Sequence, residues 1–142
     1  MSSIRLVLIN VLPWSSSITK HTISYANELA KDNDVLLVLK DEPVWQDMSV
    51  ISERVQSLYV ETFKTTDLRN VYSVHRILRE IKDFNPEVVD IRGGYPWMIF
   101  LFPMLRKYPL ISAFVTSNPR VGEKELLHYK LYSYITKNIS PI

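Results

Sequence analysis

Apolar residues form short unbroken runs that alternate with amphipathic segments along the chain. The first run, Ile4–Val11, is followed by turn residues at Leu12–Ser17 and then by apolar residues at helical spacing from Ile18 to Lys31. Val35–Leu39 is a second unbroken run. Runs of this length without polar alternation are typical of strands buried on both faces of a sheet. The pattern therefore predicts a strand–helix–strand unit at the start of the chain.

Later segments continue the same alternation. We expect further strands at Val55–Val60, nearer an edge of the sheet, at Val88–Ile91 and at Leu110–Val115, and the start of another at Asn138–Ile142. Between them we expect a short helix within Val44–Arg54, anchored by Trp45 and Met48, and helical segments at Met98–Lys107 and Glu123–Lys137. We also expect an amphipathic helix that Thr66 or Asp67 caps. Its buried positions would be Leu68, Val71, Val74, Leu78 and Ile81.

Strands that alternate with helices predict a parallel sheet with helices on both faces. Right-handed crossovers then give the strand order 3-2-1-4-5. We therefore expect one α/β domain over residues 1–142, with a doubly wound, mostly parallel, Rossmann-like sheet of about five to six strands. Ligands of such sheets bind beyond the carboxyl ends of the strands.

Composition narrows the class of protein. At 142 residues, 46% hydrophobic and 23% charged, the chain resembles an ordinary folded domain, and its net charge of +2 gives no support to nucleic-acid binding. The absence of cysteine excludes disulfides and thiolate metal sites, and the three histidines lack metal-ligand spacing. We expect no metal, no bound cofactor and no nucleic-acid partner.

Two apolar stretches bear on location. Ile4–Val11 follows Arg5 but has no small-residue cleavage site behind it, so a buried strand is favoured over a signal peptide. Trp97–Val115 is interrupted by Pro103 and Arg106 and is too short to span a membrane. We expect a cytoplasmic protein. Lysines and tyrosines of the last helix form either a peripheral contact with the inner face of an acidic membrane or a solvated face.

The first loop carries candidate chemistry without a known phosphate-loop motif. Neither the dinucleotide glycine fingerprint nor the P-loop pattern occurs. Ser16 and Ser17 enter a predicted helix, where hydroxyls and free backbone amides can bind a phosphate or sugar hydroxyls. The alternative is that Ser17 only caps the helix. His21 follows in that helix and is either a hydrogen-bond donor to a ligand or a residue of the helix flank.

Two later loops end at the same predicted edge of the sheet. Arg92, Gly93 and Gly94 follow the strand at Val88–Ile91, where a guanidinium suits an anion and glycines allow close backbone approach. Asn118 and Arg120 lie in the loop after the next strand. The alternatives are a tight turn at the first loop and an ordinary surface arginine at the second.

Three motifs resemble the N-terminal Rossmann-like domain of GT-B glycosyltransferases, especially the family-four group of retaining enzymes. They are the first loop and helix (Pro13 to Ala30, with His21), the strand and loop from Asn85 to Gly93, and the loop from Asn118 to Lys124. The chain differs from the family where Ser16-Ser17 replace a glycine pair and where Asp90 and Arg92 replace two histidines.

The resemblance implies an acceptor-binding half of a glycosyltransferase. A nucleotide-sugar would be the co-substrate, bound mostly by a C-terminal domain or second subunit, and the acceptor would be a glycan, a lipid-linked sugar or a polymer. Ser16, Ser17, Arg92, Gly93, Gly94, Asn118 and Arg120 would bind substrate, and His21 is the candidate catalytic residue. The alternatives are a non-catalytic Rossmann-like module that binds a partner protein or small anion, and a different doubly wound enzyme.

Overall fold

Strands and helices alternate along the chain, as the apolar pattern predicts. The computed structural model describes residues 3–64, 66–93 and 101–112. In chain order its elements are β1 (Arg5–Asn10), α1 (Ser17–Leu29), β2 (Asp34–Lys40), the 3-10 turn η1 (Met48–Val50), β3 (Val55–Val60), α2 (Asn70–Phe84), β4 (Val88–Gly93), α3 (Leu101–Met104) and β5 (Leu110–Ser112).

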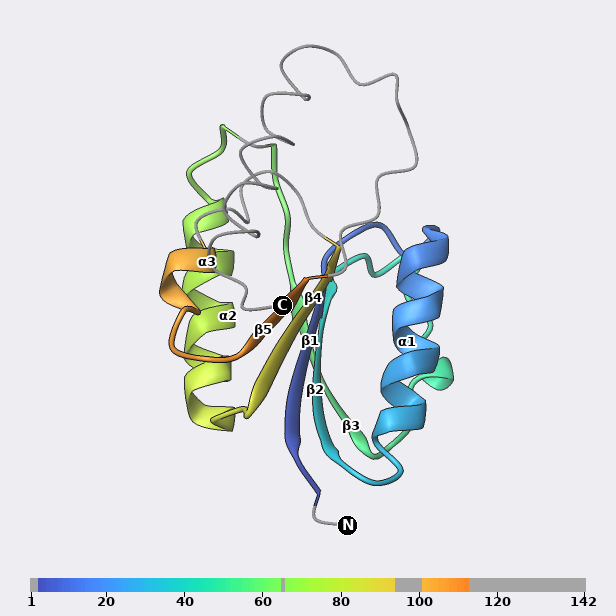
Figure 1. Cartoon of the computed structure of the whole chain (residues 1–142). Helices are drawn as coiled ribbons and strands as arrows, with labels where there is room; N and C mark the ends of the chain where they lie inside the picture. The colour runs from blue at the N-terminus through green and yellow to red at the C-terminus, as the bar shows by residue number, and fades with distance from the viewer. Residues whose placement is uncertain (1–2, 65, 94–100, 113–142) are drawn as a thin grey trace.

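The four long strands form an open parallel sheet in the order β3-β2-β1-β4, which confirms the predicted α/β class and the order of these strands. β5 has only three residues and pairs in parallel beside β4. β1 lies at the centre, where its backbone bonds to β2 on one side and to β4 on the other (Figure 1).

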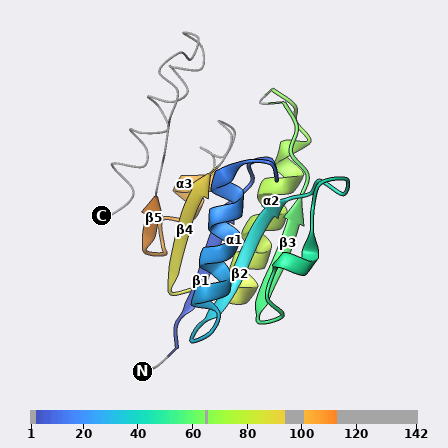
Figure 2. The same cartoon turned by 90° about the vertical axis from the view of Figure 1, so that its right-hand side faces the viewer.

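Helices cover both faces of this sheet. α1 lies on one face, and α2 and α3 lie on the other (Figure 1). Alternate residues of β1 divide between the two layers: Leu6 and Leu8 pack with α1, whereas Val7 and Ile9 pack with the residues of α2. Because both sides of β1 are buried, its sequence is apolar without alternation. Figure 2 shows α1 in front of the sheet and β3 at one edge.

The helix α2 begins later than the sequence predicts, and its buried face is only partly the predicted one: Val74, Leu78 and Ile81 pack against the core as predicted. Neither Thr66 nor Asp67 is its N-cap, because Arg69 holds that position without a side-chain cap. Leu68 and Val71 are 83% and 63% exposed. The buried positions of the helix are Asn70, Ser73, Ile77 and Ile81. The cause is Asn70, whose side chain donates to the Lys64 carbonyl and accepts from the Phe63 amide, and so ties a polar position to the inner face.

The connection between β2 and β3 corrects a second expectation. Only a three-residue 3-10 turn forms within Val44–Arg54. Trp45 and Met48 are 70% and 55% exposed, so they do not anchor it. Instead Asn27 of α1 holds the connection, since its amide donates to the Val50 carbonyl and its carbonyl accepts from the Ser52 amide.

β4 extends two residues further than predicted. Arg92 and Gly93 are the last residues of the strand and not a loop. A register shift between Ile9 and Asn10 lets Asn10 pair with Gly93, which prolongs the ladder. The predicted helix at Glu123–Lys137, the strand at Asn138–Ile142 and the segments 98–100 and 113–115 lie outside the described residues.

Candidate functional site

The carboxyl ends of the parallel strands meet at one edge of the sheet, called the rim below. β1 and β4 are neighbours there, although α1 leads from β1 to one face and α2 leads into β4 from the other (Figure 1). The chain therefore leaves β1 and enters β4 on opposite sides of the sheet. Open α/β sheets bind ligands at such a switch in topology.

A buried hydrogen-bond network fixes the loop that leaves β1. Asn10 is fully buried, and its Nδ2 donates to Thr19 Oγ1 at 2.8 Å. The Thr19 hydroxyl donates in turn to the Pro13 carbonyl at 2.9 Å. Sequence reasoning missed both residues. The available signal was a polar residue that closes an apolar run, because a buried amide requires partners.

The first loop is also tied to the next strand by Trp14. This side chain is 6% exposed, and its Nε1 donates to the Lys40 carbonyl at 2.8 Å while its backbone amide donates to Glu42 Oε1 at 2.6 Å. Its ring stacks on Tyr59 of β3 with centroids 6.4 Å apart. Trp14 therefore joins the ends of β1, β2 and β3 and is a structural residue of the rim.

Ser16 and Ser17 differ in their roles. Ser16 is the N-cap of α1, since its Oγ accepts from the Ile18 amide at 3.2 Å, so the alternative in which Ser17 caps the helix is wrong. Ser17 is the first helical residue and is exposed. His21 is exposed in the second turn. Ser17 and His21 thus remain open to a ligand at the helix N-terminus, whereas the Ser16 hydroxyl has a partner.

Gly93 lies where two strands approach closely. Its carbonyl accepts from the Val11 amide at 3.2 Å. A Cβ at this position would lie 2.5 Å from Leu12 Cδ1 and 2.6 Å from Asn10 Oδ1. A glycine is therefore required here by the packing of β1 against β4. The structure brings Gly93 together with the first loop; Gly94, Asn118 and Arg120 lie outside the described residues.

Arg92 is engaged within the protein. Its Nε donates to Asp90 Oδ2 at 3.0 Å, and its guanidinium lies over the Tyr25 ring of α1, 4.3 Å from the centroid. Asp90 is 4% exposed, and its Oδ1 has no hydrogen-bond partner among the described residues. Burial raises the pKa of the Asp90 carboxyl above its ordinary value, while Arg92 acts in the opposite direction. The result is a buried acid with one oxygen available to a donor.

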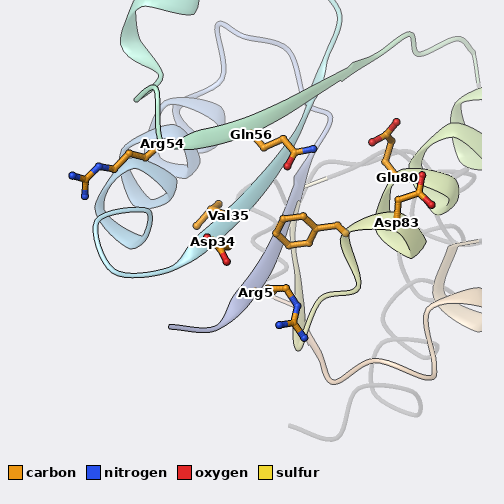
Figure 3. A pocket seen from close by; sticks show the side chains of 8 residues that line it. Arg5, Asp34, Val35, Arg54, Gln56, Glu80 and Asp83 are labelled. Atoms are coloured by element: carbon orange, nitrogen blue, oxygen red, sulfur yellow. The ribbon is translucent and has the colours of Figure 1, made fainter. Parts of the chain in front are cut away.

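A surface hollow among the described residues lies at the end of the sheet opposite the rim (Figure 3). It has a volume of about 330 Å³, and charged groups of both signs line it, including Arg5, Arg54, Asp34, Glu80 and Asp83. Arg5 Nε donates a hydrogen bond to the Asn85 carbonyl at 2.7 Å. This hollow is at the amino ends of the strands, where the fold does not favour ligands.

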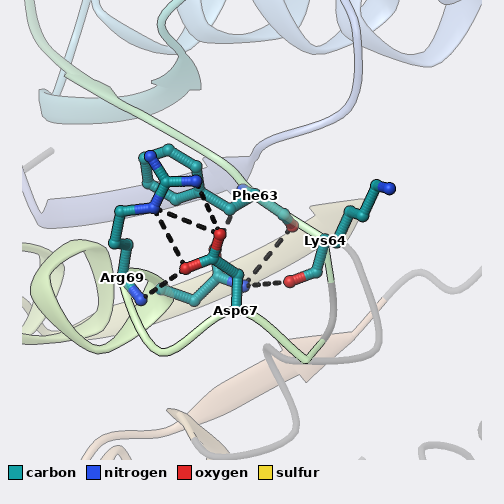
Figure 4. Close-up of polar contacts among 5 residues, drawn as sticks. Phe63, Lys64, Asp67 and Arg69 are labelled. Atoms are coloured by element: carbon teal, nitrogen blue, oxygen red, sulfur yellow. Dashed lines mark hydrogen bonds and ion pairs between the residues drawn. The ribbon is translucent and has the colours of Figure 1, made fainter.

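Another hollow among the described residues is at the rim, between the ends of β2 and β3 and the first turns of α2. It has a volume of about 340 Å³, and Asp41, Tyr72 and Arg76 are among its lining residues. Arg69 also lines it, but Asp67 pairs with that guanidinium at 2.7 Å, and Phe63 lies beneath it (Figure 4). Sequence reasoning missed this hollow because its residues come from three separate segments.

The described residues contain no group of three or more histidine and carboxylate side chains arranged to hold a metal ion. In the same ranges, no helix is both long enough and apolar enough to cross a membrane.

The geometry defines an α/β domain with an open parallel sheet, consistent with a Rossmann-like fold, whose rim carries an exposed helix N-terminus and a hollow with aromatic and cationic walls. No model of a known protein family matches the sequence, and no curated protein matches it.

Proposed function

We propose that this domain binds a sugar acceptor at its rim, as the acceptor-side half of a GT-B glycosyltransferase with a Rossmann-like sheet of about five to six strands. The observation that carries the proposal is the contact between the exit of β1 and the end of β4, where the Val11 amide bonds to Gly93. Two of the three motifs that resemble the glycosyltransferases thereby meet at one place, the place where this class of sheet binds ligands.

The available groups suit a sugar. Ser17 and His21 offer a hydroxyl and an imidazole at the N-terminus of α1. Tyr72 and Arg76 offer an aromatic face and a guanidinium in the rim hollow. A nucleotide-sugar would be the donor and would bind mostly to a second domain or subunit. Transfer would depend on positioning and on charge stabilisation at the leaving diphosphate.

The experiment uses a matched pair of exposed histidines. The chain is applied to an array of glycans and lipid-linked sugars, and the dissociation constant of the best-bound glycan is measured by calorimetry. His21→Ala should weaken binding by about tenfold or more, the value of one lost hydrogen bond to a ligand. His75→Ala, on the outer face of α2, should bind like the original chain. Equal affinities of the two variants would remove His21 from the site.

A non-catalytic module that binds a partner protein or small anion is the second candidate. The Asp90–Arg92 pair favours it over sugar transfer, because Arg92 already contacts an acidic side chain and an aromatic ring within the protein and is therefore less available to a substrate phosphate. It is favoured also by Ser16, whose hydroxyl caps α1. Failure to bind any glycan or nucleotide-sugar, together with binding of a simple anion such as inorganic phosphate, would support this candidate over sugar transfer.

A further inference from the structure

The outer edge of β3 is open along the described part of the sheet. β3 is the last strand at one end of the order β3-β2-β1-β4-β5 (Figure 2). Its six residues, Val55–Val60, include no charged side chain. Edge strands expose unpaired backbone groups that can pair with another strand, and natural edges usually carry charges or proline that prevent this. β3 lacks both of these protections.

Two contacts establish which backbone groups of β3 point outward. The Val60 carbonyl accepts from the Asp41 amide that follows β2, so Val60 faces inward to the sheet. The Tyr59 carbonyl instead accepts from Arg76 Nη1 at 2.8 Å on the outer side. Because successive residues of a strand direct their backbone groups to opposite sides, the outward positions are Val55, Ser57 and Tyr59.

Two of the six outward groups are occupied within the chain. The Val55 amide donates to the Ser52 carbonyl at 3.0 Å, and the Tyr59 carbonyl accepts from Arg76. Four groups have no partner among the described residues. They are the Val55 carbonyl, the Ser57 amide, the Ser57 carbonyl and the Tyr59 amide.

We propose that β3 pairs antiparallel with β3 of a second copy of this chain, with Ser57 opposite Ser57 on a twofold axis. In this register each Ser57 amide donates to the other Ser57 carbonyl, and each Tyr59 amide donates to the Val55 carbonyl of the other copy. All four open groups of each copy are satisfied. The two occupied groups, the Val55 amide of one copy and the Tyr59 carbonyl of the other, come opposite each other, so pairing exchanges their contacts with Ser52 and Arg76 for a bond between them.

The pattern selects both the occupant and the register. A shift of two residues in either direction would leave at least one of the four open groups without a partner from the same set. Self-complementarity of this kind is what an interface between identical copies requires. The side chains also favour this register, because it places Val55 of one copy opposite Tyr59 of the other. Pairs of a β-branched and an aromatic residue stabilise antiparallel strands. β3 itself contributes no charged residue, and the one charged group at this edge is the Arg76 guanidinium on the Tyr59 carbonyl.

Charge at Ser57 tests the register, because only this register places the residue opposite itself. Sedimentation of the original chain over a concentration series should show twice the 16.6 kDa mass of one chain at high concentration. Ser57→Lys and Ser57→Asp should each raise the dimer dissociation constant by about tenfold or more, because like charges then face each other. An equal mixture of the two variants should restore the dimer. Ser57→Ala keeps the backbone amide and is the control that should dimerise unchanged.

The outcomes separate cleanly. A monomer at every concentration up to the solubility limit would overturn the proposal. So would a dimer that both charged variants leave intact, or a mixture that does not associate although circular dichroism shows both variants folded. Hydrogen exchange needs no variant: the Ser57 and Tyr59 amides of the original chain should be protected at high concentration and exchange upon dilution. Exchange rates independent of concentration would also refute the pairing.

Discussion

Replacing Thr19 with valine tests the network that holds the rim loop. Valine keeps the shape of the side chain and removes only the hydroxyl, which accepts from Asn10 Nδ2 and donates to the Pro13 carbonyl. Asn10 is fully buried, so its Nδ2 would be left without an acceptor among the described residues, a loss that costs about 1–3 kcal/mol. The lost bond to Pro13 adds about 1 kcal/mol. We therefore expect the free energy of unfolding to fall by about 2–4 kcal/mol.

Urea unfolding followed by far-ultraviolet circular dichroism measures this change, and the melting temperature should fall by roughly 6–16 °C. Thr22→Val is the matched control in the same helix. Thr22 is also buried, but its hydroxyl donates only to the Ile18 carbonyl one turn earlier, a carbonyl that the helix already satisfies. Its loss should cost about 0.5 kcal/mol or less. If the two variants unfold within 0.5 kcal/mol of each other, on the order of the usual error, the network does not stabilise the loop.

Three further substitutions test the rim and the core. Gly93→Ala should lower the free energy of unfolding by about 1–3 kcal/mol in urea, since its Cβ would collide with Leu12 and with a buried amide; an unchanged value would refute close packing. Asp90→Asn removes a carboxyl whose pKa is raised by burial. Because the folded state holds this proton more tightly than the unfolded state, the free energy of unfolding of the original chain should fall as pH rises above 3.8, and the variant should lack this fall. The free energy of unfolding of the variant minus that of the original chain should therefore increase from pH 3 to pH 7. A constant difference would contradict that pKa. Trp14→Ala should cost about 3–5 kcal/mol and Trp45→Ala less than about 0.5 kcal/mol in thermal unfolding, because one ring is buried and the other exposed; similar costs would refute this assignment.

The arrangement of the long strands could be predicted because their burial is uniform. Strands covered on both faces are apolar at nearly every position, so the unbroken apolar runs around Val7 and Leu37 can be recognised as buried strands from the sequence. Periodicity fails where a polar residue is buried for its hydrogen bonds. Asn70 occupies the inner face of α2, and Leu68 and Val71 are exposed in consequence. No spacing rule for apolar residues finds such a position.

The candidate site was predictable only in part. Residue type places candidate residues at the end of β4, but the sequence predicts a loop at Arg92 and Gly93, which the structure shows to be the last residues of the strand. The partners that explain them, Asp90, Tyr25 and Asn10, lie across strands or on α1, so pairing in space decides their roles. The acceptor-binding role of the rim remains a prediction.

The pairing of β1 with β4 has a consequence for how the chain acquires its shape during synthesis. The two partners are separated by about eighty positions, for example Leu8 and Asp90, so β1 waits with one side unpaired until most of the polypeptide has emerged. Contacts this remote slow folding, because the intervening chain must close a large loop first. The rim between β1 and β4 would then form after β1, β2 and β3 have been made, and nascent chains stalled before Val88 would expose an apolar strand that attracts chaperones or aggregates.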